Sequence, residues 1–201
     1  MKDIRNSVFY FVGKSLYVNI TNCCPCRCDF CIRYLTDDMG TGDSLWLEHE
    51  PTLDEAKSYF DSIEEVKYAT EIVFCGYGEP TERLDMMLEL AKYMKEKTGL
   101  GIRLNTNGLS NFINKQSTEP RFKGIVDSIS ISLNQCNPAK YEALCHSKYG
   151  LDAFDEILKF TKEVKKYVPD VRMSVVSVIP VEDIEACQEI AEGLGVPLRI
   201  R

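Results

Sequence analysis

Histidine is scarce in this sequence: only His49 and His146 occur among the 201 residues, and neither lies in a motif. We predict that both are surface or loop residues, so no imidazole acid or base is expected. Apolar runs of membrane-span length, roughly 18 residues, are absent, because charge or glycine interrupts each run within about ten residues. Nothing at the N-terminus resembles a signal peptide. We therefore expect a soluble, cytoplasmic protein with no membrane contact.

Basic residues are the minority among the charged side chains. The sequence has 24 Lys and Arg against 31 Asp and Glu, a formal net charge of −7, and its basic residues are scattered. This distribution argues against a footprint for a nucleic-acid backbone. The length suffices to bury a core without disulfides, and no low-complexity linker divides it. We expect residues 1–201 to form a single domain, with a lead-in strand and hairpin at 1–14 and no C-terminal extension.

Apolar runs of strand length alternate with amphipathic helical patterns along the chain. The expected strands are 15–20, 71–75, 101–105, 126–133, 171–179 and 196–201, after a lead-in strand at 8–12. The expected helices run from 52 to about 67, from 84 to near 99, from 152, and around 184–194. This alternation predicts an α/β fold in which right-handed crossovers join parallel strands. Six units form a partial barrel or an open sheet, with function expected at the C-terminal ends of the strands.

Nine cysteines are present, and five of them fall within residues 23–31. They lie too close together to cross-link distant segments, and a reducing compartment disfavours disulfides. Cys24, Cys28 and Cys31 have the spacing C-x3-C-x2-C. Three thiolates can hold three irons of a [4Fe-4S] cube and leave the fourth iron open to another ligand. Phe30 precedes the last cysteine and is expected to shield such a cluster from water.

A zinc site is the alternative interpretation of the same stretch. Cys23 with Cys26, and Cys28 with Cys31, form two CxxC pairs separated only by Arg27. Zinc ribbons place about a dozen or more residues between their pairs, so one tetrahedral ion served by both pairs is sterically awkward. The remaining cysteines are expected to be buried small apolar residues. They are Cys75, Cys136, Cys145 and Cys187.

Two motifs in order resemble the radical S-adenosylmethionine (radical SAM) superfamily. C-x3-C-x-aromatic-C follows the first core strand, and FCGYGEP (74–80) follows the second, where that superfamily carries a GGE motif. Tyr77 replaces the first glycine, while Gly78 and Glu79 match the other two positions. The implied role of Gly78 and Glu79 is to grip the amino group of SAM, with the glycine allowing close approach of the backbone. A plain glycine turn entering a helix at Pro80 is the alternative.

Short polar side chains close the next strands, in RLNTNG (103–108) and SISISLN (128–134). Similar residues in glycyl-radical-enzyme activases contact the ribose and carboxylate of SAM. The resemblance therefore implies a group of SAM contacts: Asn105, Asn107, Ser132 and Asn134. Asn107 also fits a simple Asn-Gly turn. Ser130 lies on the same face as Ser132, one step deeper, and Arg33 is a candidate partner for the SAM carboxylate.

The resemblance implies a partial (β/α)6 radical SAM barrel and an enzyme that uses a [4Fe-4S] cluster and SAM. An external one-electron reductase of flavodoxin or ferredoxin type would reduce the cluster, and SAM would be cleaved to a 5′-deoxyadenosyl radical that abstracts hydrogen from an unknown substrate. Within the superfamily, the short chain is most similar to the small TatD-associated proteins. A glycyl-radical-enzyme activase is the alternative enzyme, and a non-catalytic iron-sulfur or zinc-binding module is the alternative of another class.

An incomplete barrel needs cover, because a carbon radical must be kept from water and oxygen. We expect a bulky substrate, a partner protein or a second copy of the chain to supply the missing wall. The loop 35–50, which carries Trp46, is expected to act as a mobile lip at the opening. The alternative is that this loop alone covers a small substrate.

Overall fold

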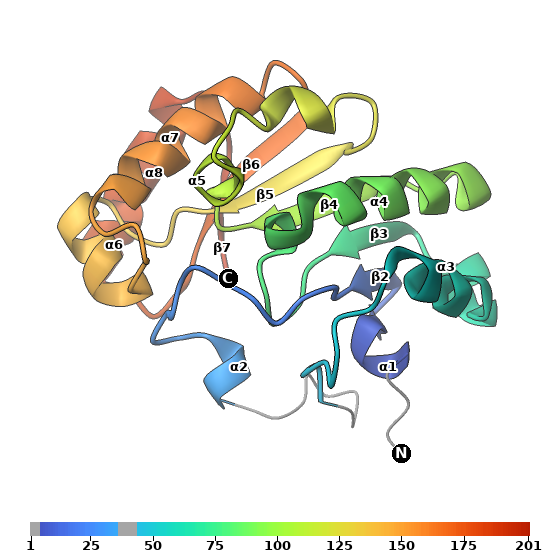
Figure 1. Cartoon of the computed structure of the whole chain (residues 1–201). Helices are drawn as coiled ribbons and strands as arrows, with labels where there is room; N and C mark the ends of the chain where they lie inside the picture. Colours follow the sequence, from blue (N-terminus) through green and yellow to red (C-terminus); the bar gives the residue numbers. More distant parts are fainter. Residues whose placement is uncertain (1–4, 36–43) are drawn as a thin grey trace.

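A computed structural model describes residues 5–35 and 44–201, and its centre is a seven-stranded sheet in which the strands follow one another in sequence order (Figure 1). The first two strands pair antiparallel, and every later neighbour pairs parallel. The strands are β1 (Phe9–Val12), β2 (Ser15–Val18), β3 (Glu71–Phe74), β4 (Ile102–Thr106), β5 (Ser128–Ser132), β6 (Asp170–Val175) and β7 (Leu198–Ile200). The prediction of an α/β fold with a lead-in hairpin and six parallel strands is confirmed.

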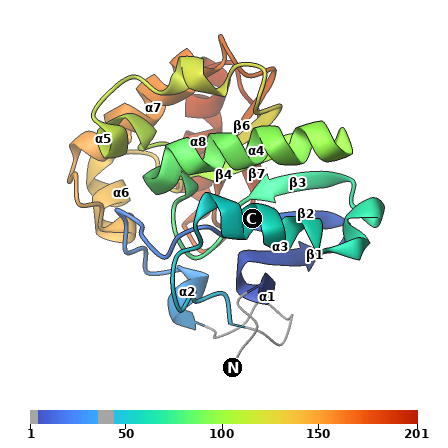
Figure 2. The ribbon, with the colours of Figure 1, turned by 45° about the vertical axis from the view of Figure 1, so that its right-hand side comes forward.

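The longer helices lie along the outer side of the sheet, whereas α2 lies apart from it (Figures 1 and 2). The helices of the described residues are α1 (Arg5–Val8), α2 (Ile32–Leu35), α3 (Leu53–Asp61), α4 (Leu84–Thr98), α5 (Ser110–Asn114), α6 (Pro138–Cys145), α7 (Asp152–Val164) and α8 (Val181–Gly193). Short 3₁₀ helices lie between helices and strands: η1 (Glu64–Tyr68), η2 (Pro80–Arg83) and η3 (Glu119–Phe122). In the described part of the chain, no helix combines the length and apolarity needed to cross a membrane.

The start of α3 follows from a capping box, whereas its end was predicted wrongly. Thr52 Oγ1 accepts from the Glu55 backbone, and the Glu55 carboxylate accepts from the Thr52 backbone at 2.8 Å. The helix ends at Asp61 rather than near residue 67. Ser62 Oγ donates to the Tyr59 carbonyl at 2.7 Å, and this local bond competes with continuation of the helix.

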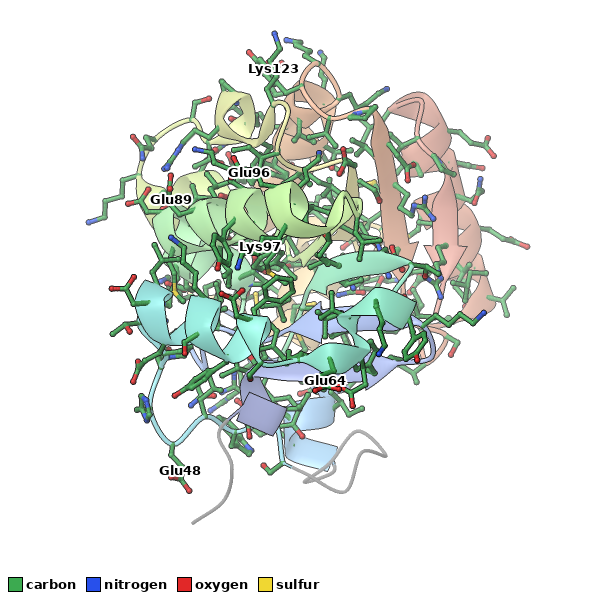
Figure 3. The ribbon with its side chains drawn as sticks, turned by 90° about the vertical axis from the view of Figure 1, so that its right-hand side faces the viewer. Glu48, Glu64, Glu89, Glu96, Lys97 and Lys123 are labelled. Carbon is green, nitrogen blue, oxygen red and sulfur yellow. The ribbon has the colours of Figure 1, made fainter. Side chains whose placement is uncertain are left out.

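Contacts between α3 and α4 fix the helices over β3. Lys97 Nζ lies 2.8 Å from both carboxylate oxygens of Asp61, and Tyr93 Oη donates to the same carboxylate at 2.6 Å. Figure 3 shows Lys97 on the side of α4 that faces α3. Gly99 then ends α4 with a φ of 70°, which glycine adopts without a side-chain penalty.

The two faces of the sheet differ in chemistry because successive strand residues point to opposite sides. Ile129 and Ile131 of β5 are buried in the core beneath the helices. The opposite face, which we call the inner face, carries polar residues in register across neighbouring strands. One row joins Asn105, Ser130 and Arg172. Polar groups therefore converge on the inner face. Because β2 to β7 run parallel, the C-terminal ends of these strands lie on one rim of the sheet.

Candidate functional site

The segment 19–31, which we call the cysteine loop, leaves β2 and docks on the end of α6. Arg27 N donates to the Cys145 carbonyl at 3.0 Å, and Lys148 N donates to the Pro25 carbonyl at 2.9 Å. Figure 1 shows the blue loop after β2 passing beside α6. Main-chain bonds to a segment more than 100 residues away thus fix the loop.

His146 adds a side-chain contact to this docking. Its Nε2 lies 2.8 Å from Asp29 Oδ1, and Asp29 N donates to the Leu144 carbonyl at 3.1 Å. His146 ends α6 with a φ of 46°. It is a loop residue, as predicted, but it contacts the cysteine loop. His49, also predicted as a surface residue, is exposed and lies 3.6 Å from Glu55 Oε1.

The thiols of Cys24, Cys28 and Cys31 are partly buried neighbours. The hydrogen bond with Cys26 raises the pKa of the Cys24 thiol, and the hydrogen bond with Cys145 raises the pKa of Cys28. Burial raises the pKa of the Cys31 thiol, and the nearby Cys24 acts in the same direction. These thiols are therefore neutral in the metal-free chain, and metal binding must displace their protons.

The donor set fits an iron-sulfur cluster by its chemistry. Three thiols from the eight-residue stretch 24–31 lie partly buried on a loop held by backbone hydrogen bonds, and soft thiolates are the ligands that such clusters require. In residues 5–35 and 44–201, no group of three His, Cys, Asp or Glu side chains already has the arrangement of a metal centre. Phe30 is half-buried and packs against the core, close enough in sequence to shelter Cys31.

Gly78 is required by a contact within the chain. A Cβ at Gly78 would lie 2.2 Å from the Thr21 carbonyl oxygen and 2.7 Å from the Cys23 carbonyl oxygen. The structure shows that the turn after β3 packs directly on the backbone of the cysteine loop. The turn that carries the FCGYGEP motif therefore packs against the loop that carries the cysteine motif. The close approach of Gly78 to SAM stays a prediction.

Glu79 is 4% exposed, and its carboxylate is bound by the chain itself. Oε1 accepts from Thr106 Oγ1 and Thr81 Oγ1, each at 2.8 Å, and from Thr81 N; Oε2 accepts from Asn107 N at 2.7 Å. Glu79 N donates to the Cys23 carbonyl at 2.8 Å. Burial raises the pKa of the Glu79 carboxyl, and these hydrogen bonds oppose that effect. Glu79 thus joins the cysteine loop to the end of β4. Its contact with a SAM ammonium stays a prediction.

We expect Glu79→Gln to lower the free energy of unfolding by about 1–3 kcal/mol. The amide nitrogen of Gln cannot accept a hydrogen bond, so one buried donor that now binds the carboxylate is left without an acceptor. If the carboxylate also meets the ammonium of SAM, the variant loses affinity for SAM while it keeps its iron. Binding isotherms on iron-loaded protein would measure this. Glu82→Gln, in the next turn, is the matched control. SAM affinity equal to the control would leave Glu79 with a structural role only.

Arg33 contacts the cysteine loop and the turn after β3 together. Its Nη1 donates to the carbonyls of Asn22 and Tyr77, each at 3.2 Å, and its guanidinium lies 4.9 Å from the centroid of the Trp46 ring. Trp46 in turn packs edge-on against Tyr77 at 5.3 Å. The predicted contact between Arg33 and the SAM carboxylate is untested. The observed contacts show that Arg33 holds the two motifs together.

The predicted lip at 35–50 lies partly outside the described residues, since 36–43 are not described. The part that is described packs closely on the chain. Leu47 N donates to Asn22 Oδ1 at 3.1 Å, and Asn22 Nδ2 donates to the Leu47 carbonyl at 2.8 Å. Leu45 is buried against Tyr10 and Tyr77. Residues 44–50 therefore rest on the cysteine loop and on the turn after β3.

The polar strand-end residues reach different partners. Asn105 Oδ1 accepts from Arg103 at 3.2 Å. Asn107 Oδ1 accepts from Leu109 N at 2.9 Å, which is the turn role, while its buried Nδ2 has no hydrogen-bond partner in the described chain. Ser132 and Asn134 are brought together, and both accept from a side chain that the sequence did not indicate, Arg201.

Several residues of this region were not identified from the sequence. Thr106 binds Glu79, and Cys145 lies beside Cys28 at the end of α6, where Asn134 Nδ2 lies 3.9 Å from its sulfur. Cys145 and Cys187 are fully buried, as predicted, whereas the prediction was wrong for Cys75 and Cys136, which are only partly buried. No pattern indicated the neighbours of Cys145. Ser174 occupies the strand next to Ser132. A polar residue inside an apolar strand was the available signal for Ser174.

Comparison with known families identifies the chain's superfamily. The sequence profile described as "Radical SAM superfamily" matches residues 18–194. This range includes the cysteine loop, the turn after β3 and the strands β3 to β6. A solved structure of methylornithine synthase superimposes over 98% of this chain and 56% of its own, with a TM-score of 0.59 at 13% identity. That similarity concerns the fold.

Two curated proteins resemble the chain at low identity. "Probable dual-specificity RNA methyltransferase RlmN" from Leptospira biflexa is 26% identical over 177 residues, covering 80% of this chain and 46% of the relative. "Putative glycyl-radical enzyme activating enzyme" from Methanocaldococcus jannaschii is 26% identical over 170 residues, covering 84% and 64%. The chain thus spans about half to two thirds of the length of these relatives.

Proposed function

We propose, because this chain belongs to the radical SAM superfamily, that Cys24, Cys28 and Cys31 hold a [4Fe-4S] cluster whose open iron binds SAM. Superfamily membership makes the chain a radical SAM enzyme and implies both cofactors and an electron donor. When bound, the cluster supplies one electron that cleaves SAM to methionine and a 5′-deoxyadenosyl radical, which abstracts hydrogen from the substrate. The substrate is unassigned.

One observation supports this proposal most directly: the turn after β3 contacts the cysteine loop. Gly78 packs on the carbonyls of Thr21 and Cys23, and Glu79 N donates to the same Cys23 carbonyl. A cysteine loop alone would suit any metal carrier. The close packing of Gly78 and Glu79 on the loop that carries Cys24, Cys28 and Cys31 supports the proposal that SAM and the cluster bind next to each other.

The chain's own residues would position the reactants and exclude water. The docking on α6 fixes the cysteine loop, and Arg33 with Trp46 covers its junction with the turn after β3. We propose that the strand-end residues contact SAM along the rim of the inner face. They are Asn105, Asn107, Ser132 and Asn134, with Phe30 sheltering the cluster.

The direct test is anaerobic reconstitution with iron and sulfide, followed by incubation with SAM and dithionite. We expect 5′-deoxyadenosine and methionine in equal amounts from the loaded protein, and neither from Cys28→Ala prepared in parallel. A loaded protein that binds SAM without cleaving it would contradict the proposal. An iron-sulfur carrier would show no change in its reduced cluster spectrum when SAM is added, and a zinc-binding module would give no reducible cluster at all.

A glycyl-radical-enzyme activase is the second candidate, supported by the similarity to the Methanocaldococcus jannaschii protein. Such an enzyme would act on a partner protein. Anaerobic pull-down with the loaded chain, followed by electron paramagnetic resonance of the captured protein, would detect a glycyl radical. A 5′-deoxyadenosine-forming enzyme that generates no radical on any captured protein would contradict the activase role.

We also propose that the chain works in the cytoplasm and takes electrons from a reductase of flavodoxin or ferredoxin type. Within the superfamily, we propose that it is most similar to the small TatD-associated proteins. Residues 1–201 act as one radical SAM core. The six parallel strands leave one side of the barrel open, so we propose that a macromolecular substrate, a partner protein or a second copy covers it.

A further inference from the structure

Three strands present a connected polar row at the open side of the sheet. Ser132 of β5 pairs in register with Ser174 of β6, and Ser174 pairs with Arg199 of β7. Residues that pair in a parallel sheet point to the same face, so all three belong to the inner face. The row lies at the C-terminal ends of these strands, on the same rim as the cysteine loop.

Arg201 extends this row. Its Nη2 donates to Ser132 Oγ at 3.2 Å and to Asn134 Oδ1 at 3.3 Å. The backbone of Arg201 is fixed on both sides, because its N donates to the Val175 carbonyl at 2.9 Å and its carbonyl accepts from Ser177 N at 2.8 Å. The side chain is therefore positioned by neutral acceptors, with its remaining donors available.

The absence of an ion-pair partner distinguishes Arg199 and Arg201 from the other described arginines on the inner face. Arg103 pairs with Glu71 through two hydrogen bonds of 2.8 and 3.0 Å, and Arg172 pairs with Asp170. In the part of the chain that the structure describes, Arg199 and Arg201 have no carboxylate within ion-pair distance. Arg199 and Arg201 are both exposed to solvent. Two uncompensated cations thus lie side by side on a chain with a net charge of −7.

Ser174 supplies an independent sign of a ligand. The residue is 1% exposed, and its Oγ is buried without a hydrogen-bond partner in the described structure. A buried hydroxyl without a partner is unfavourable and calls for an explanation. Its register neighbours are Ser132 and Arg199, so the hydroxyl lies between the polar groups just described.

We propose that Arg199, Arg201 and Ser174 form a subsite for an anionic group of the substrate, a carboxylate or a phosphate. Guanidinium groups bind such oxyanions through two parallel hydrogen bonds, and the Ser174 hydroxyl donates a further one. This inference rests on the proposed function in placing the substrate at this rim. It goes further in assigning the substrate's charge: the enzyme selects an acid or a phosphate ester over a neutral molecule.

The carboxylate of SAM offers the same chemistry, so the test must separate the two sources. Inorganic phosphate and malonate are the probes, titrated calorimetrically into anaerobic, iron-loaded protein with and without saturating SAM. We expect saturable binding of at least one probe in the presence of SAM. Arg199→Gln and Arg201→Gln should each weaken it about tenfold or more, and Ser174→Ala by less, as expected for charged and neutral hydrogen bonds. Arg121→Gln, at a partly exposed arginine paired with Asp85, should leave it unchanged.

Two results would overturn the proposal. Absence of saturable binding with SAM present would remove the subsite. Binding that occurs only without SAM, and that SAM displaces, would assign these arginines to the SAM carboxylate instead. Formation of 5′-deoxyadenosine is assayed on the same preparations without any probe. That assay tests the proposed function separately, so either idea can fail alone. Arg201→Lys and thermal unfolding of each variant control for loss of folding.

Discussion

Alanine at Cys24, Cys28 or Cys31 is expected to abolish cluster loading, whereas alanine at Cys23 or Cys26 is expected to preserve it. Each of the first three supplies one thiolate to one iron, and a cube held by two protein ligands is not retained. Cys23 is exposed, and its carbonyl rather than its thiol is used, by Glu79 N. Loss of the Cys23 thiol therefore leaves the loop intact.

Cys26 is the most informative control in this experiment, because it is at least as buried as the expected cluster ligands. Its sulfur lies 3.8 Å from Tyr141 Oη, and its thiol also hydrogen-bonds Cys24 and Cys28. We expect Cys26→Ala to lower stability by about 1 kcal/mol through lost packing while iron and sulfide content stay near wild type. Iron and sulfide analysis with the visible spectrum would measure loading. A cluster lost in Cys26→Ala and kept in Cys28→Ala would show that the ligand set is wrong.

The strand order was predictable because each strand carries its own pattern. Isoleucine alternates with serine in 128–132, and short apolar runs separated by helical periodicity predict parallel strands. The helix at 138–145 was not predicted. Only Tyr141 and Cys145 are buried in it, so its sequence lacks an apolar stripe. Its position is set by contacts with the cysteine loop, which no local pattern encodes.

Candidate site residues could be predicted from the sequence where their spacing identifies them. They could not be predicted where their contacts depend on the fold. Cys24, Cys28 and Cys31 follow from their spacing. The hydrogen bonds of Glu79 to Thr106 and Asn107 join positions 27 and 28 residues apart, and the bonds of Arg201 to β5 span nearly 70. Such pairs depend on the register of the sheet, which becomes known only when all strands are placed.

Gly78→Ala is expected to have the largest effect of any single methyl group added to this chain. The new Cβ would meet backbone oxygens of Thr21 and Cys23 at 2.2 and 2.7 Å, and a main chain held by hydrogen bonds cannot rotate away as a side chain can. We expect a loss of about 1–3 kcal/mol or more in the free energy of unfolding, typical of overpacking. Cluster loading should fall as well, because the displaced carbonyls belong to the cysteine loop.

Two other glycines turn this into a graded test. Gly193, at the end of α8, has open space around its Cβ position, so Gly193→Ala should be neutral or stabilising by up to about 1 kcal/mol. Gly76→Ala would approach Asn19 Oδ1 at 2.0 Å, but that contact is with a side chain, which can shift at the expense of its bonds to Ser7 and Leu45. Chemical denaturation and iron analysis of the three variants should therefore rank Gly78→Ala as the most damaging, Gly76→Ala as intermediate and Gly193→Ala as harmless. If Gly78→Ala unfolds at the same denaturant concentration as Gly193→Ala and loads iron fully, then the turn after β3 does not pack on the cysteine loop as described, and the contact that carries the proposed function is lost.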